Sequence, residues 1–316
     1  MAELIRISEL RIAYIGARVV GHRCLEALLQ AGANIVRLLS LDDSMVEVTT
    51  AFRSFDDLAA HYGLPARKFK TLKTPGLVSW VRESEPDLGI VIGVSQLIPP
   101  ELLHLPRLGF IGMHPTLLPE GRGRAPIPWA LIKGLSKTGV SLFYCDPGAD
   151  TGDLLAQTEV PIYYDDTSAT LGARTDDVAI ELLLDSLSRL AAGNAPRIRQ
   201  DESRATVWPR RRPDDGVIDW CRSRRELYDW VRALTHPYPG AFTHARGRKL
   251  WIWQARESSD SLTGAAGEIL NSSPEGLLVA TGRGNLEVTR AQWEHTDDLD
   301  ALHLGLRPGE RLGMAA

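Results

Sequence analysis

The sequence lacks the features that mark several large protein classes. Its 316 residues include only three cysteines, and their odd number and wide spacing fit neither a disulfide framework nor a zinc site. No window approaches the roughly 18 apolar residues of a membrane helix, and the first residues are not a signal peptide. We therefore expect a cytoplasmic protein with reduced thiols, no bound metal and no membrane contact.

An excess of positive charge is also missing. The formal net charge is −4, and 24% of the residues are charged. Proteins with a surface dedicated to nucleic acid usually carry a basic excess, so the composition disfavours a nucleic-acid partner. The 44% hydrophobic content is enough for sizeable cores, and a chain of this length favours two domains.

A dinucleotide-binding fingerprint is the third absence. The turn at residues 16–21 has Gly16 and Gly21 but not three closely spaced glycines, which disfavours an NAD enzyme. Arg18 in this turn either meets an anion or is solvated, and the sequence leaves both readings open.

The first half of the chain alternates strand-like and helix-like patterns. Apolar runs occupy residues 10–15, 35–41, 88–94, 109–113 and 140–144, and helical patterns occupy residues 21–31, 55–62, 77–83 and 166–190. Such alternation predicts a doubly wound, mostly parallel, Rossmann-like sheet covered on both faces.

The amino-acid composition and the pattern of apolar segments change after residue 191. A stretch rich in Pro, Arg and Asp is typical of a linker, and a helix at residues 224–234 follows it. Short apolar segments between turn signals then predict a small antiparallel, OB-like β-barrel. We expect a catalytic domain at residues 1–195, a linker at 196–213 and a barrel domain at 214–316.

Polar residues follow several of the predicted strands. Doubly wound sheets bind ligands beyond the carboxyl ends of their strands. His114 ends one strand just before a proline, where an imidazole can act as a general acid or polarise a carbonyl group. A lone loop histidine is more often structural, but Asp150 follows the strand at residues 140–144, and its carboxylate is suited to partner the imidazole.

Several motifs accompany these two residues. They are the Thr-Leu-Leu-Pro run at residues 116–119, the Asp-Thr-Gly loop at residues 150–152, and residues 126–134, 138–140, 212–220 and 237–242. Together with His114, these motifs resemble the folate-dependent formyltransferase family, closest to its aminoarabinose-nucleotide type. The resemblance covers nearly the whole chain.

The resemblance implies a donor, a mechanism and one departure. The donor is 10-formyltetrahydrofolate, and no metal is needed. Protonated His114 stabilises the oxygen of a tetrahedral intermediate, and Asp150 helps to move the amine proton. The family has an Asn at the third catalytic position, which is Gly112 here. Either His114 and an ordered water hold the oxyanion, or the activity has been lost or changed.

The resemblance also implies binding residues. The pterin is expected against Ser95, Leu97 and Ile98 on one loop, and against Cys145, Asp146 and Gly148 on another. For the acceptor, the candidates are Arg18, Thr116, Arg122 and Arg124. The two arginines after the His114 strand either hold phosphate or pair with nearby carboxylates.

Three functions fit these observations. The first is formylation of a small primary amine, with an amino sugar on a nucleotide as the favoured acceptor. The second is formylation of methionyl-tRNA; the tRNA enzymes carry a basic insertion after the second strand, where this chain has an acidic segment at residues 42–47. The third is non-catalytic binding of folate or nucleotide, which Gly112 motivates. The sequence leaves a homodimer open.

Overall fold

The computed structural model describes residues 7–296, 299–300 and 304–313. The chain divides into two compact units. The first contains residues up to 126, residues 138–161 and residues 173–208, and the second contains residues 127–137, 162–172 and those from 209 onward. The chain therefore crosses from one unit to the other more than once. The predicted domain boundaries 1–195, 196–213 and 214–316 stay a prediction.

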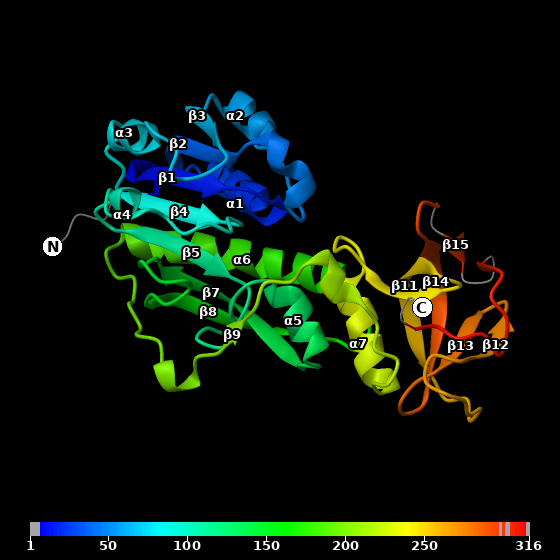
Figure 1. Cartoon of the computed structure of the whole chain (residues 1–316). Coiled ribbons are helices and arrows are strands. Elements are labelled where there is room, and N and C mark those ends of the chain that lie inside the picture. The colour runs from blue at the N-terminus through cyan, green and yellow to red at the C-terminus, as the bar shows by residue number, and fades with distance from the viewer. Residues whose placement is uncertain (1–6, 297–298, 301–303, 314–316) are drawn as a thin grey trace. The chain divides into compact units, whose positions relative to one another are not determined.

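The first unit is built on a seven-stranded sheet with the order β3-β2-β1-β4-β5-β7-β8 (Figure 1). The pairs β2–β3, β1–β2, β1–β4 and β4–β5 are parallel, whereas β5 and β7 are antiparallel. The strands are β1 (Arg11–Gly16), β2 (Asn34–Leu41), β3 (Ala66–Phe69), β4 (Leu88–Ile92), β5 (Phe110–His114), β7 (Lys137–Tyr144) and β8 (Leu154–Pro161).

The direction of β7 corrects one expectation. The segment after this strand was expected at the carboxyl edge of the parallel strands, but His114 pairs with Ser141 and Ile111 pairs with Tyr144. The strand therefore ends beside the start of β5, and its loop must turn back to approach His114. An apolar run reports burial but not strand direction, which is why the sequence did not reveal this.

Helices cover the sheet, and alternation along β1 shows how its two faces differ. Ala13 and Ile15 join a buried cluster with side chains from α3 and α4, whereas the hydroxyl of Tyr14 donates to Gly21 O in α1 at 2.6 Å. The helices of this unit are α1 (Val19–Gln30), α2 (Asp56–Tyr62), α3 (Leu77–Arg82), α4 (Pro100–Leu103) and most of α6 (Ser168–Ala191).

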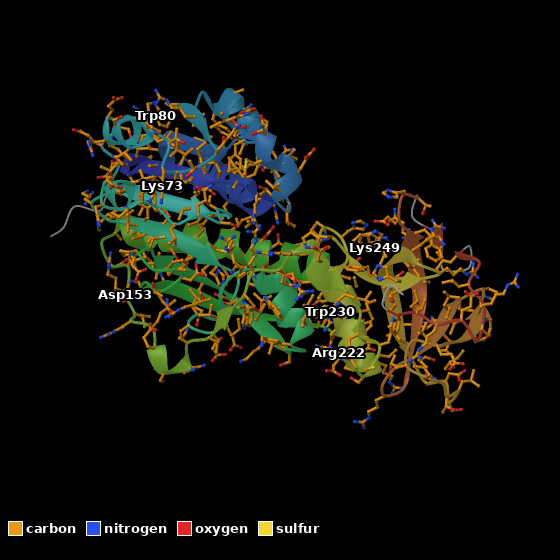
Figure 2. All side chains as sticks on the ribbon, viewed as in Figure 1. Lys73, Trp80, Asp153, Arg222, Trp230 and Lys249 are labelled. Atoms are coloured by element: carbon orange, nitrogen blue, oxygen red, sulfur yellow. The ribbon has the colours of Figure 1, made fainter. Side chains whose placement is uncertain are left out.

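The second unit contains α7 (Arg224–Leu234) and a six-stranded antiparallel sheet. A capping box between Ser223 and Glu226 begins α7, and Arg222 lies over the Trp230 ring at 5.6 Å (Figure 2). The strands are β10 (Ala241–Ala245), β11 (Arg248–Ser258), β12 (Ile269–Ser273), β13 (Gly276–Ala280), β14 (Asn285–Trp293) and β15 (Leu299–Asp300). A mostly parallel sheet with a C-terminal antiparallel sheet confirms the predicted fold class.

The segment predicted as a linker has regular structure of its own. It includes a 3-10 helix, η3 (Glu202–Arg204), and a short strand, β9 (Val207–Trp208). This strand pairs in parallel with β6 (Arg122–Gly123), the segment that follows His114 by a few residues. We call residues 197–208 the β9 segment. It is part of the first unit and packs beside the candidate site.

Helices long and apolar enough to cross a membrane are absent from the described part of the chain.

Candidate active site

His114 lies at the end of β5 and is buried, with 6% of its surface exposed. Its Nε2 is 2.8 Å from Gly121 O. Because a carbonyl oxygen can only accept, Nε2 must carry a proton. The nitrogen that gains or loses a proton is therefore Nδ1, and this nitrogen faces Asp150.

Asp150 is held in the left-handed region, with φ of 58°. Its Oδ2 lies 3.6 Å from His114 Nδ1 and accepts a 2.9 Å hydrogen bond from Gly123 N. A separation of 3.6 Å is too long for a hydrogen bond but close enough for an ion pair. An imidazole protonated on both nitrogens can therefore donate a hydrogen bond from Nδ1 to a substrate oxygen, with the Asp150 carboxylate beside it.

The loop after His114 is anchored by strand side chains. Ser141 Oγ donates to Thr116 O at 2.7 Å and accepts from Leu118 N at 3.2 Å. Gln157 Nε2 donates to Leu118 O and to Ser141 Oγ, at 2.9 and 2.8 Å. These bonds fix the backbone that runs from His114 toward Gly121, its hydrogen-bond partner.

Gly112 is buried under its neighbours and does not have a positive φ. A Cβ atom there would lie 2.8 Å from Cζ of Phe143 and 3.0 Å from Sγ of Cys145. Two side chains therefore occupy the space in which an asparagine side chain would start. The packing, not the backbone conformation, accounts for glycine at this position.

The predicted donor loop after β4 is held by arginines. Ser95 Oγ accepts from Arg18 Nη2 at 3.0 Å, and Ser95 O accepts from Arg124 Nη2 at 2.9 Å. Leu97 is 60% exposed, whereas Ile98 packs against the buried cluster beside α3 and α4. The loop thus presents one apolar side chain to the exterior and anchors another in the core.

The second predicted donor loop, residues 145–153, is bonded within itself. Asp146 Oδ1 accepts from Gly148 N at 3.0 Å and from Thr151 Oγ1 at 2.6 Å. Cys145 N donates to Phe110 O at 2.7 Å, and burial raises the pKa of the Cys145 thiol far above its usual range. This thiol is therefore protonated at neutral pH and is a packing group here.

The four predicted acceptor residues have different surroundings. Arg18 and Arg124 meet at Ser95, and Arg124 is exposed. Thr116 is buried, and its Oγ1 has no hydrogen-bond partner among the described residues. Arg122 is only 5% exposed, and its guanidinium donates to Glu202 at 2.7 and 2.9 Å. Because Arg122 already has a carboxylate partner, the geometry gives the phosphate-binding prediction for it no support.

Sequence reasoning missed three residues that complete this arrangement. Gly121 and Gly123 contact His114 and Asp150 through their backbones, and both have positive φ, of 74° and 108°. The two glycines on either side of Arg122 were the feature of the sequence that could have indicated an unusual backbone conformation here. Gln200 also touches the Asp150 loop, and its place in an apparent linker gave no sign of this.

A cavity of about 490 Å³ lies within the first unit and is lined in part by residues 144–146 and 151–153. Both charge signs line it, including Arg197 and Arg199 as well as Asp146, Glu202 and Asp153, which is labelled in Figure 2. Arg197 lies over the Tyr144 ring at 3.7 Å. The mixed lining does not single out a ligand.

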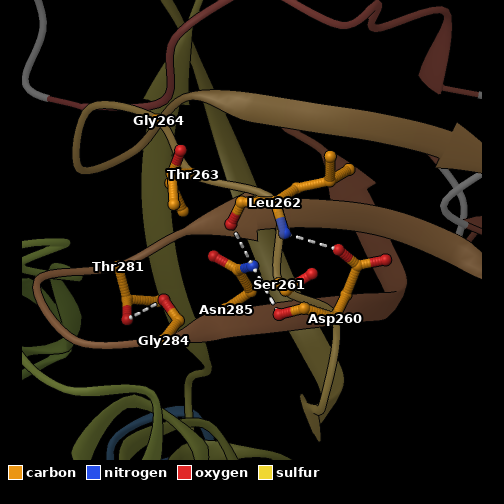
Figure 3. Close-up of a pocket in the computed structure, with 9 residues that line it drawn as sticks. Asp260, Ser261, Leu262, Thr263, Gly264, Thr281, Gly284 and Asn285 are labelled. Atoms are coloured by element: carbon orange, nitrogen blue, oxygen red, sulfur yellow. Dashed lines mark hydrogen bonds between the residues drawn. The ribbon is translucent and has the colours of Figure 1, made fainter.

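A smaller hollow of about 230 Å³ lies in the second unit (Figure 3). Asn285 Nδ2 donates to Asp260 O and to Leu262 O, at 3.1 and 2.8 Å, and Leu262 N donates to the Asp260 carboxylate. These bonds tie the loop together, so we assign the hollow no chemistry. Clusters of three or more metal-ligating side chains do not occur within the described ranges.

Comparison with known proteins covers almost the whole chain. The formyl transferase family model matches residues 10–187, and the model of the formyl transferase C-terminal domain matches residues 211–305. The methionyl-tRNA formyltransferase of Geobacter sulfurreducens is 32% identical over 315 residues, which is 97% of this chain and 98% of that protein. That of Citrifermentans bemidjiense is 32% identical over 310 residues, 96% of each chain.

Solved structures share the fold at lower identity. WlaRD, a sugar 3N-formyltransferase, is similar with a TM-score of 0.68 and 14% identity, over 91% of this chain and 99% of that one. HypX from Aquifex aeolicus gives a TM-score of 0.67 and 19% identity over 92% of this chain, which spans about half of HypX (46%). The predicted enzyme class is confirmed, since this chain belongs to the formyl transferase family.

Proposed function

We propose that this enzyme transfers a formyl group from 10-formyltetrahydrofolate to a primary amine, with His114 and Asp150 as its catalytic residues. The observation that carries the proposal is their geometry: an imidazole fixed through Nε2, with its Nδ1 3.6 Å from a carboxylate. A solved structure of HypX is a complex with tetrahydrofolic acid, and one of WlaRD was determined in the presence of dTDP and 5-N-formyl-THF. These relatives support folate as the donor.

The reaction places clear demands on this pair. The amine attacks the formyl carbon, a new C–N bond forms, and the formyl oxygen becomes negative in a tetrahedral intermediate. The Nδ1–H of charged His114 donates to that oxygen, and stabilisation of such an oxyanion is usually the largest single term in catalysis of this kind. Asp150 takes the amine proton and passes it to N10 of the folate as the old C–N bond breaks.

Gly112 makes His114 the main side-chain donor to the oxyanion. Because Phe143 and Cys145 fill the space beside Gly112, no amide can reach the intermediate from β5. One oxyanion donor is worth about 2.7–4 kcal/mol in other enzymes. We infer that an ordered water takes the second position.

The pterin would bind between the loops at residues 95–98 and 145–150. Ser95, Leu97 and Ile98 line one side, and Cys145, Asp146 and Gly148 line the other. The exposed Leu97 side chain offers an apolar contact to an aromatic ring system. Backbone groups of both loops would bind the polar edge of the pterin.

We propose an amino sugar attached to a nucleotide as the acceptor. Acidic residues follow β2, in the 3-10 helix η2 (Asp43–Val48), and they would repel a long polyanion. Three of the six arginines at residues 197–212 contact other side chains of the protein. Arg197 lies over Tyr144, Arg204 pairs with Glu120, and Arg211 lies over Trp129 and Trp230. Arg18, Thr116 and Arg124 stay the proposed acceptor residues, with Arg124 the best placed for a phosphate, whereas Arg122 is buried and paired with Glu202.

Methionyl-tRNA is the second candidate acceptor. The observation that favours it is the 32% identity to methionyl-tRNA formyltransferases over nearly their whole length. Because this similarity extends over nearly the whole chain, it does not show whether the residues that bind folate or those that bind the acceptor are the more similar.

Competition between acceptors tests the proposal. Purified enzyme is given 10-formyltetrahydrofolate with a nucleotide-linked amino sugar and methionyl-tRNA together, at 50 and 200 mM salt. Selective formylation of the sugar with weak salt dependence supports the proposal. Formylation of methionyl-tRNA that falls steeply with salt overturns the acceptor assignment, because tRNA binding depends on phosphate contacts. Folate binding without transfer to either amine would indicate a non-catalytic protein.

A further inference from the structure

The β9 segment contributes a buried amide to the wall of the candidate site. Gln200 is only 4% exposed, and its Nε2 donates to Asp150 O at 2.9 Å and to Gly152 O at 2.6 Å. One side chain thus binds the carbonyl of the proposed catalytic aspartate and that of a residue two positions later. This leaves the Asp150 side chain free to face His114.

Gln200 is itself fixed by Arg122. The oxygen Oε1 of Gln200 accepts from Arg122 Nη2 at 2.8 Å and from Arg122 Nε at 3.2 Å. Because the oxygen is bound to a guanidinium, the amide nitrogen must point at the Asp150 loop. The Glu202 carboxylate raises the pKa of Arg122 and keeps this side chain charged.

Arg122 also connects both members of the catalytic pair. Its neighbour Gly121 accepts from His114 Nε2, and its other neighbour Gly123 donates to Asp150 Oδ2. Thr206 Oγ1, in the β9 segment, accepts from Gly121 N at 2.8 Å. The β9 segment therefore supports both the His114 imidazole and the Asp150 carboxylate through residues 121–123, which include the short strand β6.

We propose that Gln200 is a positioning residue for formyl transfer, which holds the left-handed Asp150 loop so that its carboxylate faces His114. Arg122 orients Gln200 in this role and does not bind substrate. The inference rests on the proposed function, because it assigns Gln200 to the same reaction. It also explains why a segment with the composition of a linker is buried beside the site.

Steady-state kinetics of two Gln200 variants test this role. Gln200→Ala removes both donated bonds, and Gln200→Glu keeps the shape and the acceptor for Arg122 but loses the donor. Asn285→Ala is the matched control, since Asn285 is also 4% exposed and also donates to two backbone carbonyls, but lies in the second unit. We expect both Gln200 variants to lose about 100-fold in kcat, with the folate KM nearly unchanged. The control should stay within about 3-fold of wild type.

A double-mutant cycle separates positioning from general stability. If Gln200 acts through Asp150, Gln200→Ala should cost less than about 2-fold in the Asp150→Asn background. A full, additive loss in that background would overturn the proposal. If Gln200→Ala does not fold, Gln200→Glu carries the same cycle.

Amide hydrogen exchange gives a readout that does not require activity. The Gly123 amide donates to Asp150 Oδ2, so its exchange should speed up at least 10-fold in Gln200→Ala and not in Asn285→Ala. If the wild-type protein formylates no amine, the proposed function is refuted. Faster Gly123 exchange in Gln200→Ala would then still support the role of Gln200 in positioning Asp150. Unchanged Gly123 exchange with wild-type kcat would refute the role of Gln200.

Discussion

The two loops proposed to hold the donor are supported in different ways. Residues 145–153 are held by buried groups, with Gln200 and Arg122 4% and 5% exposed. The loop after β4 is held at Ser95 by Arg124, whose side chain is exposed. We infer that the first loop is prepared for proton transfer and the second for adjustable binding, since catalytic groups need more exact placement than binding groups.

The largest expected effect separates chemistry from binding at the first loop. His114→Ala and Asp150→Asn should each lower kcat by at least about 100-fold, as expected for groups in general acid–base catalysis. The double variant should be little slower than either single variant, because the pair acts as a unit. Steady-state rates and thermal melts measure this. A near-normal rate from either single variant would remove the pair from the mechanism.

Thiol modification tests whether the first loop is closed. Cys221 is exposed. Burial raises the pKa of the Cys145 thiol far above its usual range, and burial raises the pKa of the Cys24 thiol to about 12. Since the thiolate is the reactive form, iodoacetamide at pH 8 should modify Cys145 at least about 10-fold more slowly than Cys221. Peptide mass spectrometry over time gives both rates. Equal rates in the wild-type protein would mean that the loop opens readily.

Gly112→Asn tests the packing beneath the first loop. A side chain at this position collides with Phe143 and Cys145, so we expect a loss of about 1–3 kcal/mol in stability and no gain in rate. Gly172→Ala is the control, because a Cβ there meets nothing within 4 Å. Urea unfolding measures the difference. A faster, fully stable Gly112→Asn enzyme would show that an oxyanion donor was merely missing.

The smallest effect is expected at the second loop. Arg124→Ala removes an exposed hydrogen bond to Ser95 O, of a kind worth about 0.5–1.5 kcal/mol, so the KM for folate should rise about 2- to 10-fold with kcat unchanged. Arg107→Ala, which removes an exposed arginine paired with Asp87, should leave KM unchanged. A fall in kcat for Arg124→Ala would place this loop in the chemistry and end the distinction between the two loops.

Much of the fold followed from local patterns. The predicted helix at residues 224–234 coincides with α7, because a capping box begins it and an apolar face is buried in its own unit. Four parallel strands, β1, β2, β4 and β5, were placed to within about two residues, since continuous apolar runs are typical of buried strands. Strand β3 was not predicted, because its Ala-Arg-Lys-Phe sequence contains no apolar run and only its last residue is buried. The direction of β7 was not predictable, because direction depends on the path of the chain around His114.

The site was predictable only in part. Motifs led to His114 and Asp150, which the structure brings within 3.6 Å. Gln200 could not be found, since it lies 50 residues from Asp150 in a segment with the composition of a linker. Arg122 and Arg124 looked equivalent in sequence. Tertiary contacts alone make one a buried support and the other an exposed side chain.

The most direct test of the central claim is the fate of a labelled formyl group. Enzyme in excess is mixed with 10-[13C]formyltetrahydrofolate and a nucleotide-linked amino sugar, and mass spectrometry follows the label. The account predicts that wild type moves the label onto the sugar amine, and that Asp150→Asn binds the folate equally well but transfers at least about 100-fold more slowly. Label that stays on the folate with the wild-type enzyme, or moves equally fast with Asp150→Asn, would contradict it.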